Sequence, residues 1–246
     1  MTANPTQNIY DDDAFFAGYS RLPRSVQGLD GAPEWPALRA LLPDLRDLRV
    51  VDLGCGYGWF CRFAREQGAA EVLGLDVSEK MLARAREMTS DPAIQYQRAD
   101  LESVALPDEI FDLAYSSLAL HYLVHLDRLV ANVSRALRPG GRFVFSAEHP
   151  LFTAPSEPGW IETAGRKIWP LDRYLDEGPR VTDWLAPGVV KQHRTIGTYL
   201  NLLIRCGFRI DHVEEWGPTA AQIAAHPEWA VERDRPPFLL VAATRV

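Results

Sequence analysis

The stretch "VVDLGCGYGWF", from Val50 to Phe60, decides the fold of this chain. An apolar pair leads into an acid, and glycines follow at Gly54, Gly56 and Gly58. This order is typical of a strand, a tight turn and the start of a helix, and such turns commonly hold a nucleotide-like cofactor. The stretch therefore predicts a cofactor-binding loop after the first strand of an α/β fold.

The sequence after this loop alternates short apolar runs with amphipathic segments. Strands are predicted at residues 48–54, 71–77, 94–100, 111–120 and 141–150, with helical patterns between them. This alternation predicts a parallel sheet that is covered by helices on both faces. Ligands of such sheets bind at the carboxyl ends of the strands, so the site is expected at that edge.

After His149 the alternation stops. Residues 151–190 are rich in Pro, Gly, Trp and Asp and predict a loop-rich insertion with a hairpin around "VTDWLAPGVV". An amphipathic helix that ends at Gly207 follows, and residues 209–216 and 238–246 are predicted as the last two strands. The segment between these strands is predicted to be a broken helix.

The bulk composition restricts the classes of function. The 246 residues are 47% hydrophobic and carry a net charge of −7, which is a poor match to a nucleic-acid backbone. The cysteines Cys55, Cys61 and Cys206 show no metal-ligand spacing and do not suggest a disulfide framework. No apolar stretch approaches the ~20 residues of a membrane span, and the first residues do not resemble a secretory signal. A cytoplasmic protein with no metal, membrane or nucleic-acid partner is expected.

Three acids and one tryptophan bear on the cofactor. A dinucleotide fingerprint places a third glycine where this chain has Trp59. Asp52 would repel a pyrophosphate but attract a cation such as S-adenosylmethionine, which carries an ammonium and a sulfonium. Asp76 ends the second strand, where an acid meets ribose hydroxyls, and Asp100 ends the third. A nicotinamide cofactor is therefore disfavoured, although Asp76 alone suits either cofactor.

With these residues the chain resembles the class I S-adenosylmethionine-dependent methyltransferases, of the type-11-like branch that acts on small molecules. The resemblance is carried by "VVDLGCGYGW", "VLGLDVSEKMLARAR", "YQRADLESVALPDEIFDLAYSSLALHYL" and "ALRPGGRFVFSAEHP", over roughly residues 45–150. It implies a Rossmann-like, doubly wound, mostly parallel seven-stranded sheet with an antiparallel last strand. It also implies one methyltransferase domain, divided into an N-terminal lid (1–44), a cofactor-binding core (45–150), a substrate-covering insertion (151–195) and a C-terminal part (196–246).

The resemblance implies a set of residues that hold S-adenosylmethionine. Glycines of the loop approach its methionine part, one acid lies near its ammonium, another takes the ribose, and residues after the second and third strands hold the adenine. A tryptophan walls the pocket, and an arginine of the lid suits the methionine carboxylate. The cofactor-binding residues expected in this way are Tyr19, Arg24, Asp52, Gly54, Gly56, Trp59, Asp76, Val77, Met81, Asp100, Leu101 and Ser116.

Histidines near the strand ends are the candidate bases, because histidine exchanges protons near neutral pH. His149 is the first choice and His121 the second, and simple hydrogen bonding is the competing interpretation for both. His193 and Tyr122 are expected to contact substrate. Aromatic residues of the insertion either wall a substrate pocket or cover the core; these are Phe152, Trp160, Trp169, Tyr174 and Trp184.

The predicted reaction transfers a methyl group from S-adenosylmethionine to an O, N or C atom of a small aromatic or apolar metabolite and leaves S-adenosylhomocysteine. Two alternatives stay open at this point. One is an RNA or protein methyltransferase, which would need a basic surface beside the pocket. The other is a non-enzymatic S-adenosylmethionine-binding regulator. The sequence leaves open whether the protein is a monomer or a homodimer.

Overall fold

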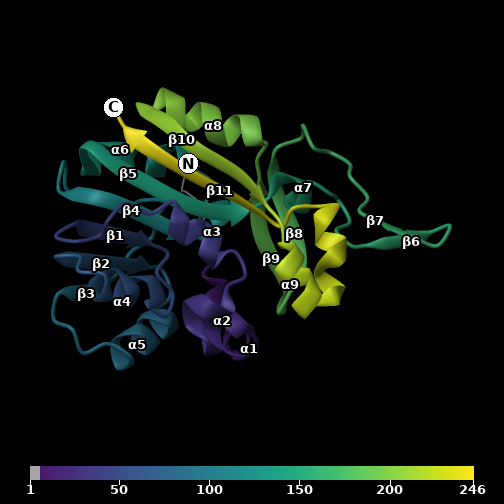
Figure 1. Cartoon of the computed structure of the whole chain (residues 1–246), viewed down its shortest axis with the longest axis horizontal. Helices are drawn as coiled ribbons and strands as arrows, with labels where there is room; N and C mark the ends of the chain where they lie inside the picture. Colours follow the sequence, from purple (N-terminus) through teal and green to yellow (C-terminus); the bar gives the residue numbers. More distant parts are fainter. Residues whose placement is uncertain (1–5) are drawn as a thin grey trace.

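The computed structural model describes residues 6–246, and its centre is a seven-stranded sheet (Figure 1). The strand order is β10-β11-β5-β4-β1-β2-β3. Only β11 runs antiparallel to its two neighbours, which confirms the predicted Rossmann-like sheet with an antiparallel last strand. The strands are β1 (Arg49–Leu53), β2 (Glu71–Asp76), β3 (Ile94–Arg98), β4 (Phe111–Ser117), β5 (Leu137–Glu148), β10 (Phe208–Trp216) and β11 (Phe238–Arg245).

Both faces of the sheet are covered by helices, so successive strand residues are buried on opposite sides. Val50 packs into the cluster that holds α3 and α4, whereas Val51 packs into the cluster beneath α6 and α8. This double burial explains why the strands read as continuous apolar runs. The helices of these layers are α3 (Trp35–Ala40), α4 (Trp59–Glu66), α5 (Glu79–Glu87), α6 (Leu126–Ala136) and α8 (Ile196–Arg205). Ser78 is the N-cap of α5, since its hydroxyl accepts from the Met81 amide.

The N-terminal segment lies across the carboxyl ends of the strands. Asp11 accepts hydrogen bonds from the Ser78 hydroxyl and the Lys80 amide at the start of α5. Gln7 donates to the Gly188 carbonyl in the insertion. The segment thereby joins the start of α5 to the insertion; residues 1–5 of the predicted lid lie outside the described residues. Its elements are η1 (Ile9–Asp11), α1 (Asp13–Tyr19), α2 (Pro23–Val26) and η2 (Gly28–Gly31).

The insertion after β5 contains two hairpins, of which the sequence predicted one. The predicted hairpin is formed by β8 (Gly178–Trp184) and β9 (Ala186–His193). The second, β6 (Ile161–Thr163) with β7 (Arg166–Ile168), extends away from the body of the molecule (Figure 1). It has three exposed residues in each strand and therefore no buried face to produce an apolar pattern.

Short helices complete the described chain. They are η3 (Leu120–Tyr122), α7 (Pro150–Thr153), α9 (Ala220–Ala225) and η4 (Pro227–Arg233). The last two form the broken helix that the sequence predicted between β10 and β11. Across residues 6–246, no helix has both the length and the apolar character that crossing a membrane requires.

Replacing Gly54 by alanine should destabilise the fold more than replacing Gly140. Both glycines have a left-handed backbone, with φ of +83° and +80°, so both alanines pay roughly 1–2 kcal/mol for that conformation. A Cβ at residue 54 would lie 2.5 Å from the Ala119 Cβ, whereas nothing lies within 4 Å at residue 140. Overpacking adds about 1–3 kcal/mol to Gly54→Ala alone. Urea unfolding measures both variants, and equal losses would contradict the close packing at Gly54.

Candidate active site

The glycine loop after β1 is tied to the end of β2. The Gly56 amide donates to Asp76 Oδ2 over 2.8 Å, and the Ser78 amide donates to the other oxygen over 2.9 Å. Apart from its own chain neighbours, no atom of the described residues lies within 4 Å of the position that a Cβ on Gly56 would take. The loop therefore leaves open space beside a carboxylate that backbone amides hold in place.

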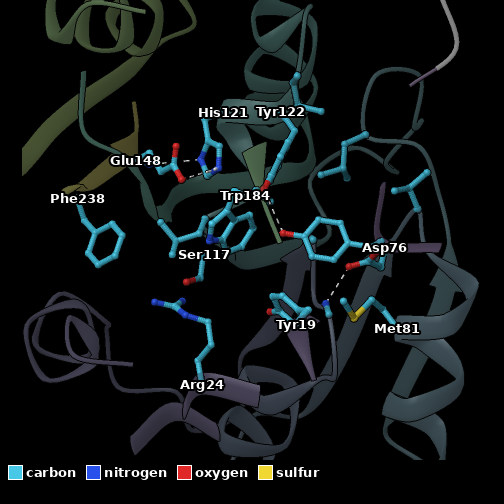
Figure 2. A pocket seen from close by; sticks show the side chains of 18 of the residues that line it. Tyr19, Arg24, Asp76, Met81, Ser117, His121, Tyr122, Glu148, Trp184 and Phe238 are labelled. Atoms are coloured by element: carbon cyan, nitrogen blue, oxygen red, sulfur yellow. Dashed lines mark hydrogen bonds and ion pairs between the residues drawn. The ribbon is translucent and has the colours of Figure 1, made fainter. Parts of the chain in front are cut away.

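A cavity of about 350 Å³ lies along the carboxyl ends of the strands (Figure 2). The N-terminal segment, the insertion and the stretch that leads into β11 supply its other walls. At its β2 end are Gly54, Gly56, Asp76 and Asp100. The predicted site residues that line the cavity are Tyr19, Arg24, Gly54, Gly56, Asp76, Val77, Met81, Asp100, Leu101, His121, Tyr122, Phe152 and Trp184.

Three predicted cofactor residues lie outside this lining. Asp52 is buried beneath the loop, where the Cys61 thiol donates to its carboxylate over 3.3 Å. The ring of Trp59 packs against Gly28, and the Arg62 guanidinium stacks over it, so the ring does not line the cavity. The Ser116 hydroxyl points into the sheet and donates to the Leu53 carbonyl. Because strand side chains alternate, the next residue, Ser117, faces the cavity instead.

Two predicted histidines are also placed elsewhere. His149 is buried and caps α7: its Nδ1 accepts from the Leu151 amide. Its Nε2 lies 2.8 Å from Glu215, a residue of β10. His193 lies between the Thr153 hydroxyl and the Tyr174 carbonyl. Both rings are therefore occupied by structural hydrogen bonds and neither lines the cavity.

His121 lines the cavity, but its ring nitrogens are directed at Glu148. Nδ1 accepts from the Glu148 amide over 3.3 Å, and Nε2 lies 4.0 Å from the Glu148 carboxylate (Figure 2). The pKa of His121 falls to about 4, mainly because the ring is buried; Glu148 acts to raise the pKa, and Lys191 and Arg194 act to lower it. The neutral ring therefore carries its proton on Nε2, toward Glu148, and has no free nitrogen to act as a base.

Glu148 is a cavity residue that the sequence analysis missed. One carboxylate oxygen pairs with the Lys191 ammonium over 2.5 Å, and the other is buried without a partner among the described residues. The Lys191 nitrogen lies 4.9 Å from the centroid of the Trp184 ring. The sequence signal that could have identified Glu148 was its position one residue before His149, because neighbouring strand residues face opposite ways.

Several other lining residues come from segments without a motif. Tyr10 belongs to the N-terminal segment, and its hydroxyl lies 3.2 Å from that of Tyr122. Glu232 and Arg235 belong to the stretch between α9 and β11, and Phe238 is the first residue of β11. Tertiary structure alone brings them to the cavity. Within the described part of the chain, His, Cys, Asp and Glu do not cluster in threes that would hold a metal ion.

Two buried acids give the β2 end of the cavity its electrostatic character. Burial raises the pKa of Asp76 to about 6, even though the amides of Ser78 and Gly56 act to lower it. Burial also raises the pKa of Asp52 to about 7. Since an opposite charge favours the ionised form, a cation in the cavity would stabilise both carboxylates.

Comparison with known proteins agrees with this geometry. Residues 51–145 match a family described as a methyltransferase domain. The crystal structure of an S-adenosylmethionine-dependent methyltransferase from Mesorhizobium loti is 66% identical, covers 89% of this chain and 100% of its own, and has a TM-score of 0.85. The chain belongs to the S-adenosylmethionine-dependent methyltransferases. This membership excludes a nicotinamide oxidoreductase.

Other relatives of this methyltransferase differ in how much of the chain they share. A solved protein from Listeria monocytogenes is 40% identical, covers 87% of this chain and 99% of its own, and has a TM-score of 0.80. A malonyl-[acyl-carrier protein] O-methyltransferase from Enterobacter lignolyticus is 38% identical over 150 residues. That match covers 61% of this chain and 54% of the relative, so it spans about half of that enzyme.

Replacing Asp52 by asparagine should stabilise the methyltransferase at alkaline pH relative to acid pH. The folded-state pKa of about 7 exceeds the ordinary 3.8. The contribution of Asp52 to the free energy of unfolding is therefore fully present below about pH 4 and is lost as pH rises through 7. Asparagine does not ionise, and the difference between variant and wild type should therefore grow by up to ~4 kcal/mol between pH 4 and pH 8. Urea unfolding at the two pH values measures it, with Asp108→Asn at the surface as control. A pH-independent difference would contradict the raised pKa.

Proposed function

We propose that the protein transfers a methyl group from S-adenosylmethionine to an O, N or C atom of a small aromatic or apolar metabolite. The observation that carries the proposal is one cavity with two different ends. Gly54, Gly56 and Asp76 line the β2 end, and Phe152 and Phe238 line the other. A cofactor and an aromatic acceptor can therefore meet within one cavity. The acyl-carrier relative, by its name, methylates an oxygen of a malonyl group on an acyl-carrier protein.

The residues at the β2 end suit the methyl donor. The open space at Gly56 is proposed to receive the methionine part, and the Asp76 carboxylate, which lines the same end, is proposed to accept from ribose hydroxyls. Asp100 and Leu101 are proposed to hold the adenine, and Val77 and Met81 to lie beside it. Asp100 already accepts from the Thr6 hydroxyl over 2.6 Å, so the N-terminal segment reaches over that part of the cavity.

Arg24 is proposed to bind the methionine carboxylate. Its guanidinium points into the cavity (Figure 2) and is held by both oxygens of Glu34 at 3.1 and 3.2 Å. Glu34 is almost completely buried, so it fixes the arginine in one direction. A guanidinium has five N–H donors, and enough remain for a second carboxylate.

When bound, S-adenosylmethionine supplies a methyl group on a positively charged sulfur, which a nucleophile attacks directly. The protein then has to orient the acceptor and exclude water. Tyr10 and Tyr19 from the N-terminal segment, together with Trp184 from the insertion, line the cavity. No part of this chemistry requires the histidines that the sequence suggested.

Glu148 replaces those histidines as the proposed proton acceptor. It lines the cavity, whereas His149 does not and His121 has no free nitrogen. Lys191 holds one oxygen of the carboxylate from the side of the protein. An acceptor hydroxyl or amine can therefore donate its hydrogen bond, or its proton, to Glu148.

Two alternative functions can be distinguished from this proposal. An RNA or protein methyltransferase would need a basic surface beside the cavity, and a non-enzymatic regulator would bind the donor without methyl transfer. An RNA substrate is disfavoured by the net charge of −7. A non-enzymatic regulator would bind the donor but release no S-adenosylhomocysteine in the presence of any acceptor. No observation on the described residues favours either alternative over a small-molecule enzyme.

The donor site is tested by thermal unfolding and calorimetry. S-Adenosylmethionine and S-adenosylhomocysteine at ~100 times their Kd should stabilise the protein by about 2.7 kcal/mol, and NAD should not. Asp76→Ala removes a charged hydrogen-bond acceptor and should weaken S-adenosylhomocysteine binding by ~10- to 100-fold. The surface variant Asp108→Asn should bind normally. Undiminished affinity in Asp76→Ala would remove that residue from the donor site.

The role of Glu148 is tested by turnover. A panel of phenols, amines and carboxylic acids, screened by release of S-adenosylhomocysteine, should yield an acceptor. With that acceptor, Glu148→Gln should lower kcat by ~10²- to 10⁴-fold if the residue takes a proton, and leave S-adenosylhomocysteine affinity unchanged. His149→Gln, outside the cavity, should have a much smaller effect on kcat. The reverse order of the two variants would reinstate His149 as the base.

A further inference from the structure

Arg235 is a buried cation at the β5 end of the cavity, and neither the donor site nor the proton acceptor uses it. It is 4% exposed and lines the cavity. Its guanidinium carbon lies 4.2 Å from the ring centroid of Trp169, 4.4 Å from that of Phe152 and 5.3 Å from that of Trp160. A planar guanidinium stacks well on aromatic faces, so three rings hold this one in position.

The guanidinium of Arg235 retains unused donors. Its Nη2 pairs with the carboxylate of Glu232, three residues earlier. Within residues 6–246, its Nε is buried without a partner, and its Nη1 makes no hydrogen bond. A buried donor that is left without an acceptor is unfavourable. The group is therefore prepared to bind an acceptor that enters the cavity.

The surrounding charges favour an anionic ligand over a cationic one. Glu148 is already paired with Lys191, and Glu232 is already paired with Arg235. Lys191 and Arg235 also lie over the Phe152 ring, at 5.8 and 4.4 Å. A cationic ligand would have to displace one of these side chains from its carboxylate and its ring. An anion needs only the free donors of Arg235.

The same charges limit how much negative charge the ligand can carry. Glu148 and Glu232 both line this end of the cavity and would repel a dianion such as a phosphate monoester. A carboxylate has a single charge and can accept a charge-assisted hydrogen bond from Nε or Nη1 of Arg235. The ring of Phe238, also at this end, offers an apolar surface to the body of the ligand.

We infer that Arg235 binds a carboxylate of the methyl acceptor, which is then a small aromatic or apolar carboxylic acid. This inference rests on the proposed function, because that function assigns the opposite end of the cavity to the methyl donor. Arg235 selects the substrate and does not activate it. Pairing with a guanidinium withdraws charge from the carboxylate oxygens, so the methylated atom is a different group of the same molecule.

Isothermal titration of the full chain, with and without saturating S-adenosylhomocysteine, tests the inference. The probes are benzoate and phenylacetate, their neutral amides, the amines benzylamine and phenethylamine, and phenylphosphonate. At least one carboxylate should bind ~10- to 100-fold more tightly than its amide, as expected for a charge-assisted hydrogen bond. Arg235→Gln should abolish this preference, and Arg235→Lys should retain part of it.

Arg233→Gln is the matched control, because Arg233 is an exposed arginine two residues away and should leave the preference unchanged. The unfolding midpoint of each variant shows whether it is folded. If Arg235→Gln does not fold, Arg235→Lys still tests the inference. Tighter binding of an amide, an amine or the phosphonate would overturn the inference, as would a full preference in Arg235→Gln or no carboxylate binding at all. If S-adenosylhomocysteine fails to bind, the proposed function fails, whereas Arg235-dependent carboxylate binding in its absence leaves the anion site standing.

Discussion

The hydrogen bond from the Gly56 amide to the Asp76 carboxylate is the interaction on which the site depends. It joins the loop after β1 to the end of β2 and so fixes the edge of the sheet where the cavity begins. The loop can reach that carboxylate because glycines at 54 and 56 adopt positive φ angles. A second amide, from Ser78, holds the other oxygen and places the start of α5 against the same point. Strand, loop and helix are thus positioned by one carboxylate.

This arrangement has an electrostatic cost. Asp52 and Asp76 are both buried, and burial raises the pKa of each into the range of about 6 to 7. The protein therefore has two buried carboxyl groups, whose ionised forms are disfavoured, next to the cavity. The family to which it belongs uses a cationic methyl donor. A bound cation would offset part of that cost, which links donor binding to the charge state of the loop. This is a different use of the loop from that in dinucleotide folds, where the positive end of a helix meets a pyrophosphate.

The two ends of the cavity are built by different parts of the chain. The β2 end comes from residues near the glycine loop, and its side chains follow from strand order. The β5 end combines Glu148 with Phe152 from the insertion and Arg235 from the stretch before β11. At this end each charge is paired with another protein charge, and aromatic rings cover the cations. The β2 end is therefore built from the sheet and its loops, whereas the β5 end also draws on the insertion and on the stretch before β11.

The sequence by itself determined the sheet, its glycine loop and the acids Asp76 and Asp100, because these depend on local patterns of strand, turn and strand end. It also placed Tyr19 and Arg24 in the segment that reaches the cavity. It did not decide which of two adjacent residues faces the cavity, because successive strand residues point to opposite sides and the sequence does not say which side is which. Ser117 and Glu148 line the cavity, whereas their neighbours Ser116 and His149 do not. Only the tertiary structure brought Arg235 there, because long-range packing leaves no periodic signal in the sequence.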